Sequence, residues 1–184
     1  MPEELTQFQL SLLRVLDEAI KIDGAAKGNV QLLNRAVGGL QHTVQRGFDS
    51  SFLQMFALVR VDDPTSCARA LRYQHRVIIP DITKDLLSGP YLSICKANGF
   101  QALQSTPIIG EDGLIKGVFS THFAKTHHLS DTASRALDVC AFEMARLVAE
   151  HEKKLRKTRK GAWKGWISPS TSSADSCFEK QLPA

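Results

Sequence analysis

Four hydroxyl residues and a histidine lie within the apolar stretch 100–123, and four of these five side chains are the ones best suited to bind a small molecule: Ser105, Thr106, Ser120 and His122. Hydroxyl and imidazole groups inside a pocket would hydrogen-bond a ligand, while the apolar surroundings would exclude water from it. The alternative is that these side chains satisfy the ends of strands. The residues themselves leave both interpretations open.

The stretch 100–123 is predicted to form a β-hairpin, which fixes the direction of these side chains. Its two halves are rich in β-branched, aromatic and aliphatic residues, and the turn 110–113 (Gly-Glu-Asp-Gly) separates them. Because side chains alternate along a strand, Ser120 and His122 share a face with Val118, and the residues between them form the core face. One of the two hydroxyls in the first half should therefore lie beside Ser120.

Other familiar chemical motifs are missing from the sequence. The glycines match neither GxGxxG nor GxxxxGK[ST], so no phosphate-binding loop is predicted. The four cysteines are widely separated and form no CxxC pair, which argues against a zinc site and a disulfide scaffold. We interpret them as buried or incidental thiols: Cys67, Cys95, Cys140 and Cys177.

Composition indicates one ordinary globular domain followed by a basic tail. Residues 153–184 carry eight basic and two acidic side chains, whereas residues 1–152 carry 15 basic and 17 acidic ones. The near-neutral domain argues against general nucleic-acid binding.

No apolar run is long enough for a transmembrane segment, and the acidic N-terminus is unlike a secretion signal, so a cytoplasmic location is expected.

The basic tail could contact an acidic surface. Seven of the twelve residues in 153–164 are basic, with two tryptophans within or beside this segment, a composition that suits nucleic acid, acidic lipid or an acidic partner. A solvated helix end that leads into a disordered tail is the alternative. Residues 167–184 are rich in Ser and Pro and are predicted to be disordered.

Strands in antiparallel pairs, with helices at both ends of the chain, predict an α+β fold. His42 is interpreted as a structural histidine that shares a strand face with Leu40, Val44 and Phe48, and the pair His127-His128 is expected in an exposed loop. Helices are predicted at 4–22, 50–57, 65–71, 85–98 and from 130 or 131 to about 155, and strands at 28–33, 40–48, 76–80, 100–108 and 114–123. Extra apolar residues on the first helix and near-heptad apolar spacing along the last one also suit a homodimer.

The order of several short motifs closely resembles a GAF domain, in the version found beside bacterial sensor histidine kinases and signalling phosphatases. The motifs are GNVQLL, QRGFDSSFLQMF, SCARAL, RVIIPDI, GFQALQSTPI and GLIKGVFSTHF. The resemblance covers residues 5–152. It implies a central antiparallel sheet of five or six strands, with the terminal helices on one face and short helices over a ligand pocket on the other.

The resemblance also implies a regulatory module that binds a small molecule, dimerises and acts through a partner such as a signalling kinase or phosphatase. Asp81 and Arg69 occupy segments expected near the family's pocket, and the guanidinium of Arg69 would suit an anionic ligand. Neither the ligand nor any cofactor is identified by the residues.

A thiol redox enzyme is the alternative function. Free methionine-(R)-sulfoxide reductases are stand-alone GAF proteins of similar length, and Cys67 and Cys95 lie in regions comparable to those that hold their active-site cysteines. Such an enzyme needs an activated thiolate and a resolving cysteine. The segments SCARAL and LSICKANG lack that family's longer signature, so the sequence favours a non-catalytic module.

Overall fold

The computed structural model describes residues 4–166, and the chain divides into two units after His151. The fold of the first unit is described below. The helical elements are α1 (Gln7–Ile22), α2 (Ser50–Met55), α3 (Ser66–Tyr73), the 3-10 helix η1 (Leu86–Tyr91), α4 (Leu92–Ala97) and α5 (Asp131–Trp166). The strands are β1 (Lys27–Asn34), β2 (Gly39–Arg46), β3 (Leu58–Arg60), β4 (Val77–Ile79), β5 (Ala102–Ile109) and β6 (Ile115–Phe123).

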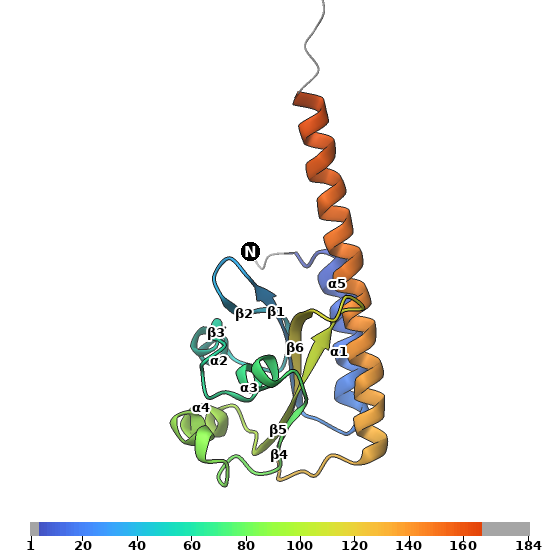
Figure 1. Cartoon of the computed structure of the whole chain (residues 1–184). Coiled ribbons are helices and arrows are strands. Elements are labelled where there is room, and N and C mark those ends of the chain that lie inside the picture. The colour runs from blue at the N-terminus through green and yellow to red at the C-terminus, as the bar shows by residue number, and fades with distance from the viewer. Residues whose placement is uncertain (1–3, 167–184) are drawn as a thin grey trace, which may run out of the picture. The chain divides into compact units, whose positions relative to one another are not determined.

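The strands form one six-stranded antiparallel sheet in the order β3-β2-β1-β6-β5-β4 (Figure 1). The hairpins β1–β2 and β5–β6 meet through the pairing of β1 with β6, so the centre of the sheet joins the two halves of the chain. At the β5–β6 turn, Gly113 has a positive φ and the Asp112 carboxylate accepts a hydrogen bond from the Leu114 amide. The predicted α+β class and its central antiparallel sheet are confirmed.

Helices α1 and α5 cover one face of this sheet (Figure 1). The Thr6 side chain begins α1 in a capping box with Gln9, which satisfies two amides at the helix start. The apolar stripes of both helices pack against the side chains on this face of the sheet. The fully buried members of this core include Leu12, Leu16, Val30, Phe119, Leu137 and Met144.

The short helices cover the other face, where a second core lies beneath them (Figure 1). The Asp49 carboxylate caps α2 by accepting a hydrogen bond from the Phe52 amide, and Thr65 caps α3. Aromatic side chains dominate this core because Phe48, Phe52 and Phe100 contact one another there. The two cores lie on opposite sides of a single sheet.

A β-bulge in β2 corrects one sequence prediction. Val44 pairs with Val30, but His42 pairs with Gln31, so Thr43 is an extra residue on β2. The extra residue reverses the alternation of side chains along the strand. Val44 therefore packs beneath α1 and α5, while Leu40 packs in the aromatic core, and the prediction that both share one face was wrong.

Two further differences concern short elements. Strand β3, which pairs with β2, was not predicted, because three residues carry too little periodicity to be recognised. The helix expected at 85–98 is divided into η1 and α4, and the break follows Pro90, which lacks an amide hydrogen for an α-helical bond.

The second unit begins within α5. Side chains at 153–158 are exposed, which leaves the basic character of this part of α5 open to solvent. The segment 167–184 lies outside the described residues, so its predicted disorder stays a prediction. Within residues 4–166, no helix has the length and apolar character needed to cross a membrane.

Candidate functional site

A cavity of about 60 Å³ lies between the sheet and the short helices. Polar side chains from the two central strands form its floor: Asn29 and Gln31 on β1, and Ser120 and His122 on β6. Asn29 pairs with Ser120 across the two strands, and alternation places the other two side chains on the same face. The floor is therefore a compact polar patch at the centre of the sheet.

A chain of three hydroxyl groups supports one side of this floor. The Ser105 hydroxyl donates to Ser66 Oγ at 2.9 Å, and Ser105 Oγ lies 2.7 Å from Ser120 Oγ. Because a serine has a single hydroxyl hydrogen, Ser120 must donate to Ser105 in this arrangement. The remaining lone pairs of Ser120 are thus acceptors. The predicted proximity of Ser120 to one hydroxyl of the neighbouring strand is confirmed, and that hydroxyl belongs to Ser105.

The walls and roof of the cavity combine apolar rings with a few polar groups. The apolar lining consists of Phe52, Phe56, Ile79, Phe100 and Leu103. The polar lining outside the floor comes from the start of α3 and from the η1–α4 segment: Thr65, Ser66, Cys67, Ser88, Tyr91 and Cys95. The arrangement has the composition of a small-molecule site, which is largely apolar with a few placed polar groups.

Three buried polar atoms in and beside the floor have no hydrogen-bond partner within the described chain: Asn29 Oδ1, His42 Nε2 and His122 Nδ1. Asn29 Nδ2 lies 3.4 Å from His42 Nδ1, which leaves the amide oxygen available. An unsatisfied buried polar group costs about 1–3 kcal/mol, so several together at one place are unusual in a folded protein. A bound molecule that hydrogen-bonds these atoms would remove that cost.

Both histidines are neutral at physiological pH. Burial lowers the pKa of His122 to about 3, with smaller contributions from Lys27 and His42. Burial also lowers the pKa of His42 to about 4. The ring of His122 is surrounded by Phe48, Phe52 and Phe100, none of which can compensate a positive charge as a carboxylate would.

This burial predicts that the protein loses stability in mild acid because of His122. The unfolded histidine binds a proton below about pH 6.5, whereas the folded one does so only below about pH 3, so stability falls as the pH decreases between these values. From pH 7.5 to 4.5, the wild type should lose about 2–3 kcal/mol more than His122→Phe. Urea unfolding at both pH values measures this difference.

The matched control for that measurement is His128→Phe, because His128 is exposed. It should leave the wild-type pH profile unchanged. If His122→Phe lost stability with acid as steeply as the wild type, the folded imidazole would not be held neutral by burial.

Two cysteines also line the cavity, one at the start of α3 and one in α4. Removal from water raises the pKa of Cys67, and burial raises the pKa of Cys95 to about 11. Thr65 Oγ1 lies 3.3 Å from Cys67 Sγ and partly offsets the shift. Both groups are therefore thiols rather than thiolates near neutral pH, and a thiol is a poor nucleophile.

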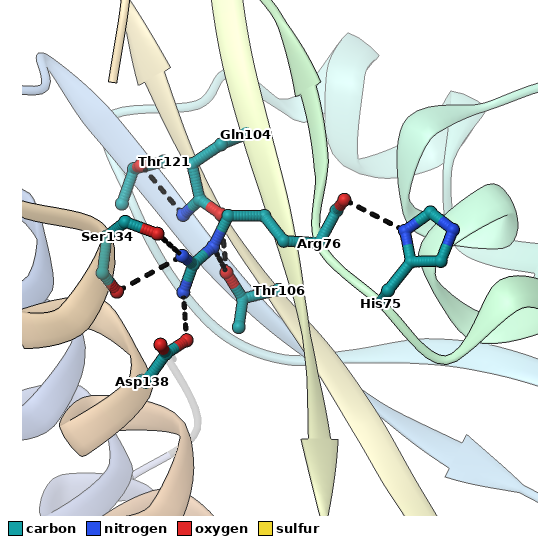
Figure 2. Close-up of polar contacts among 7 residues, drawn as sticks. All are labelled: His75, Arg76, Gln104, Thr106, Thr121, Ser134 and Asp138. Atoms are coloured by element: carbon teal, nitrogen blue, oxygen red, sulfur yellow. Dashed lines mark hydrogen bonds and ion pairs between the residues drawn. The ribbon is translucent and has the colours of Figure 1, made fainter. Parts of the chain in front are cut away.

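The structure separates Thr106 from the cavity. Thr106 follows Ser105 on β5 and so points to the opposite face, where its Oγ1 accepts a hydrogen bond from Arg76 Nε at 2.7 Å and donates to Gln104 Oε1 at 2.6 Å. Figure 2 shows it within a polar cluster that reaches Ser134 and Asp138 on α5. Adjacent residues of a strand face opposite ways, so Thr106 lies outside the cavity that Ser105 supports.

Asp81 and Arg69 do not line the cavity either. The Asp81 carboxylate accepts hydrogen bonds from the amide and hydroxyl of Thr83 and borders a separate surface hollow. Arg69 Nη1 lies 2.9 Å from Asp85 Oδ1, so its charge is already paired. Of the six predicted ligand-binding residues, Ser120 and His122 line the cavity and Ser105 supports it, whereas Thr106, Asp81 and Arg69 lie elsewhere.

Sequence reasoning missed two residues of the floor and misplaced one histidine. Asn29 and Gln31 alternate with Val30 and Leu32 in GNVQLL, so the period of two on β1 was the available signal. His127, expected to be exposed, stacks on Phe123 with ring centroids 3.9 Å apart and contacts Asp23. Among the described residues, no cluster of His, Cys, Asp or Glu is arranged to hold a metal ion.

Neither a family model nor a curated protein matches the sequence, so the fold is identified by comparison with solved structures. A domain of a two-component sensor histidine kinase protein from Sinorhizobium meliloti aligns with a TM-score of 0.70 at 14% identity, covering 83% of this chain and 99% of that domain. The GAF domain/HD domain protein from Geobacter sulfurreducens aligns with a TM-score of 0.66 at 15% identity, covering 82% and 97%. The chain has a GAF fold.

The GAF fold accounts for the two layers of helices and confirms the resemblance inferred from the motifs. A type II free methionine-R-sulfoxide reductase from Thermoplasma acidophilum has the same fold, with a TM-score of 0.64 at 17% identity over 78% of this chain and 93% of that one. Identities this low establish the shared architecture alone. Function must therefore be argued from the side chains in the cavity of this fold.

Proposed function

We propose that residues 1–152 form a regulatory GAF module that binds a small molecule in the cavity between the sheet and the short helices. The module would act in the cytoplasm of a bacterium as a sensor in signal transduction, without catalysis. Ligand binding would shift the terminal helices, and a signalling kinase, a phosphatase or a second copy of the chain would respond to that shift. The basic segment 153–164 remains a predicted contact for an acidic surface.

The observation that carries the proposal is the unsatisfied polar floor of the cavity. Asn29 Oδ1 and His122 Nδ1 are buried and have no hydrogen-bond partner among residues 4–166; both side chains line the cavity, on the two strands at the centre of the sheet. A purely structural core would replace such groups with apolar ones, because their burial opposes folding. Their presence favours a site that a bound molecule completes.

Native mass spectrometry of the purified full chain tests this proposal. We expect a small molecule to copurify, seen as added mass that is released on denaturation, and we expect Phe52→Trp to reduce it because the larger ring would fill the cavity. Met55→Trp is the control, since Met55 is exposed on the same helix. Identical masses before and after denaturation, with no shift on adding metabolite extract, would contradict the proposal.

We also propose that the module forms a homodimer through α1 and α5. Val139 and Phe142 lie three residues apart on α5 and are 68% and 58% exposed, and Leu10 on α1 is 38% exposed. Such large apolar side chains on neighbouring helices suit a contact between subunits.

Sedimentation velocity tests the dimer. The wild type should sediment as a dimer at tens of micromolar, and Phe142→Glu should convert it to a monomer because a charge would be placed in the interface. Leu86→Glu is the matched control, since Leu86 is 96% exposed on η1, and it should leave the dimer intact. A monomeric wild type would exclude this part of the proposal.

The reductase alternative is supported by the position of Cys67 and Cys95 on one cavity, and it is opposed by their raised pKa values. We therefore expect no turnover of free methionine-(R)-sulfoxide with a thioredoxin system. Robust turnover that Cys95→Ser abolishes would replace the sensor proposal with an enzymatic one.

A further inference from the structure

The part of the chain that the structure describes gives the cavity no ionic group with which to bind a charged molecule. Of the described residues that line it, none is an aspartate, glutamate, lysine or arginine. The nearby Arg69 is paired with Asp85 outside the lining. A charged ligand would lose its hydration on entry and find no counter-charge, a penalty of several kcal/mol.

Two side chains of the floor, Asn29 and Ser120, present hydrogen-bond acceptors. Asn29 Oδ1 accepts only, and Ser120 has given its one hydrogen to Ser105, so its free positions also accept. These two residues are directly paired across β1 and β6, which places both acceptors on the same part of the floor. His122 Nδ1, two residues along β6, is a third unsatisfied position.

The volume limits the size of the part of a ligand that the cavity encloses. A cavity of about 60 Å³ holds about four to six water molecules. A nucleotide or a tetrapyrrole is far larger than this space. The aromatic rings of Phe52, Phe56 and Phe100 line the rest of the cavity and favour an apolar part in the ligand.

We propose that the occupant is a small uncharged molecule, an inference that rests on the proposed function. Its N–H or O–H groups donate to Asn29 Oδ1 and Ser120 Oγ, and its apolar part lies against the phenylalanine rings. Primary amides are the simplest compounds of this kind. An amide also differs from its carboxylate in charge and in donors but hardly in shape, so the two make a matched pair.

NMR titration of the ¹⁵N-labelled full chain tests the inference with acetamide against acetate, propionamide against propionate, and benzamide against benzoate. We expect the smaller amides to shift the backbone resonances of β1 and β6 and to bind at least about tenfold more tightly than their carboxylates. Asn29→Leu should weaken amide binding about tenfold, while Asn34→Leu, at the end of the same strand and outside the lining, should not.

The outcomes separate the two proposals. Tighter binding of the carboxylates would overturn the inference and leave small-molecule binding intact. Amide binding that Asn29→Leu does not weaken would also overturn it. Binding of neither series would overturn it as well, and the native mass measurement would then decide whether the module binds any small molecule.

Discussion

Ser120→Asp should destabilise the protein by about 3–5 kcal/mol more than Ser120→Asn at pH 8. The two new side chains have nearly the same shape, so any strain from their size is shared. Only the aspartate introduces a charge, and it would do so where Ser120 is 4% exposed and no described lining residue is cationic. The difference between the two variants thus measures the cost of a negative charge in the cavity.

The penalty of Ser120→Asp should depend on pH in a defined direction. Burial would raise the folded pKa of the new carboxyl above its unfolded value of about 3.9. The two variants should therefore be equally stable near pH 4, and the aspartate variant should become progressively less stable as the pH rises toward its folded pKa. Urea unfolding across this range gives the curve, and a gap below about 1 kcal/mol at pH 8 would show that the cavity tolerates anions.

Arg76→Met should destabilise the protein by about 2–4 kcal/mol. The guanidinium donates to Thr106 Oγ1, to the Ser134 carbonyl at 3.1 Å and to Asp138 Oδ1 at 2.6 Å, and its side chain is only 12% exposed (Figure 2). Thr106 in turn bonds Gln104, whose amide donates to Thr121 Oγ1 at 3.0 Å. Methionine would fill similar space but would leave the buried Thr106 Oγ1 and the part-buried Ser134 carbonyl short of a donor, whereas water could replace it at the exposed Asp138.

Arg146→Met provides the control on α5 itself. Arg146 pairs with Glu143 and Glu150, but its side chain is 47% exposed, so its loss should cost less than about 1 kcal/mol. Thermal or urea unfolding compares the two variants. Equal losses would mean that the Arg76 cluster contributes no more than an exposed ion pair, and that the link between the sheet and the start of α5 lies elsewhere.

The sheet-side part of the site could be predicted from the sequence because it depends on local patterns. Alternation in GVFSTHF places Ser120 and His122 together, and the Asp-Gly turn sets the pairing that brings Ser105 to Ser120. The same rule, applied to both members of the Ser105-Thr106 pair, identifies which of the two must face away. Pattern and pairing were sufficient where the strand was regular.

The rest of the site depends on contacts that no local pattern specifies. One extra residue at Thr43 reversed the predicted face of Val44, and a single-residue bulge leaves little trace in hydrophobic periodicity. The ion pair of Arg69 with Asp85 joins a residue of α3 to one just before η1, sixteen positions apart in the sequence. No local pattern indicates this ion pair, so the sequence suggested that Arg69 was a free cation for an anionic ligand.

A crystal structure of the full chain grown with propionamide would test the central claim most directly, because the claim concerns specific atoms in one cavity. We expect an ordered molecule between the sheet and the short helices, with its nitrogen within hydrogen-bonding distance of Asn29 Oδ1 or Ser120 Oγ. A cavity closed by protein side chains, or occupied by water alone with Asn29 and His122 bonded to protein groups, would contradict it.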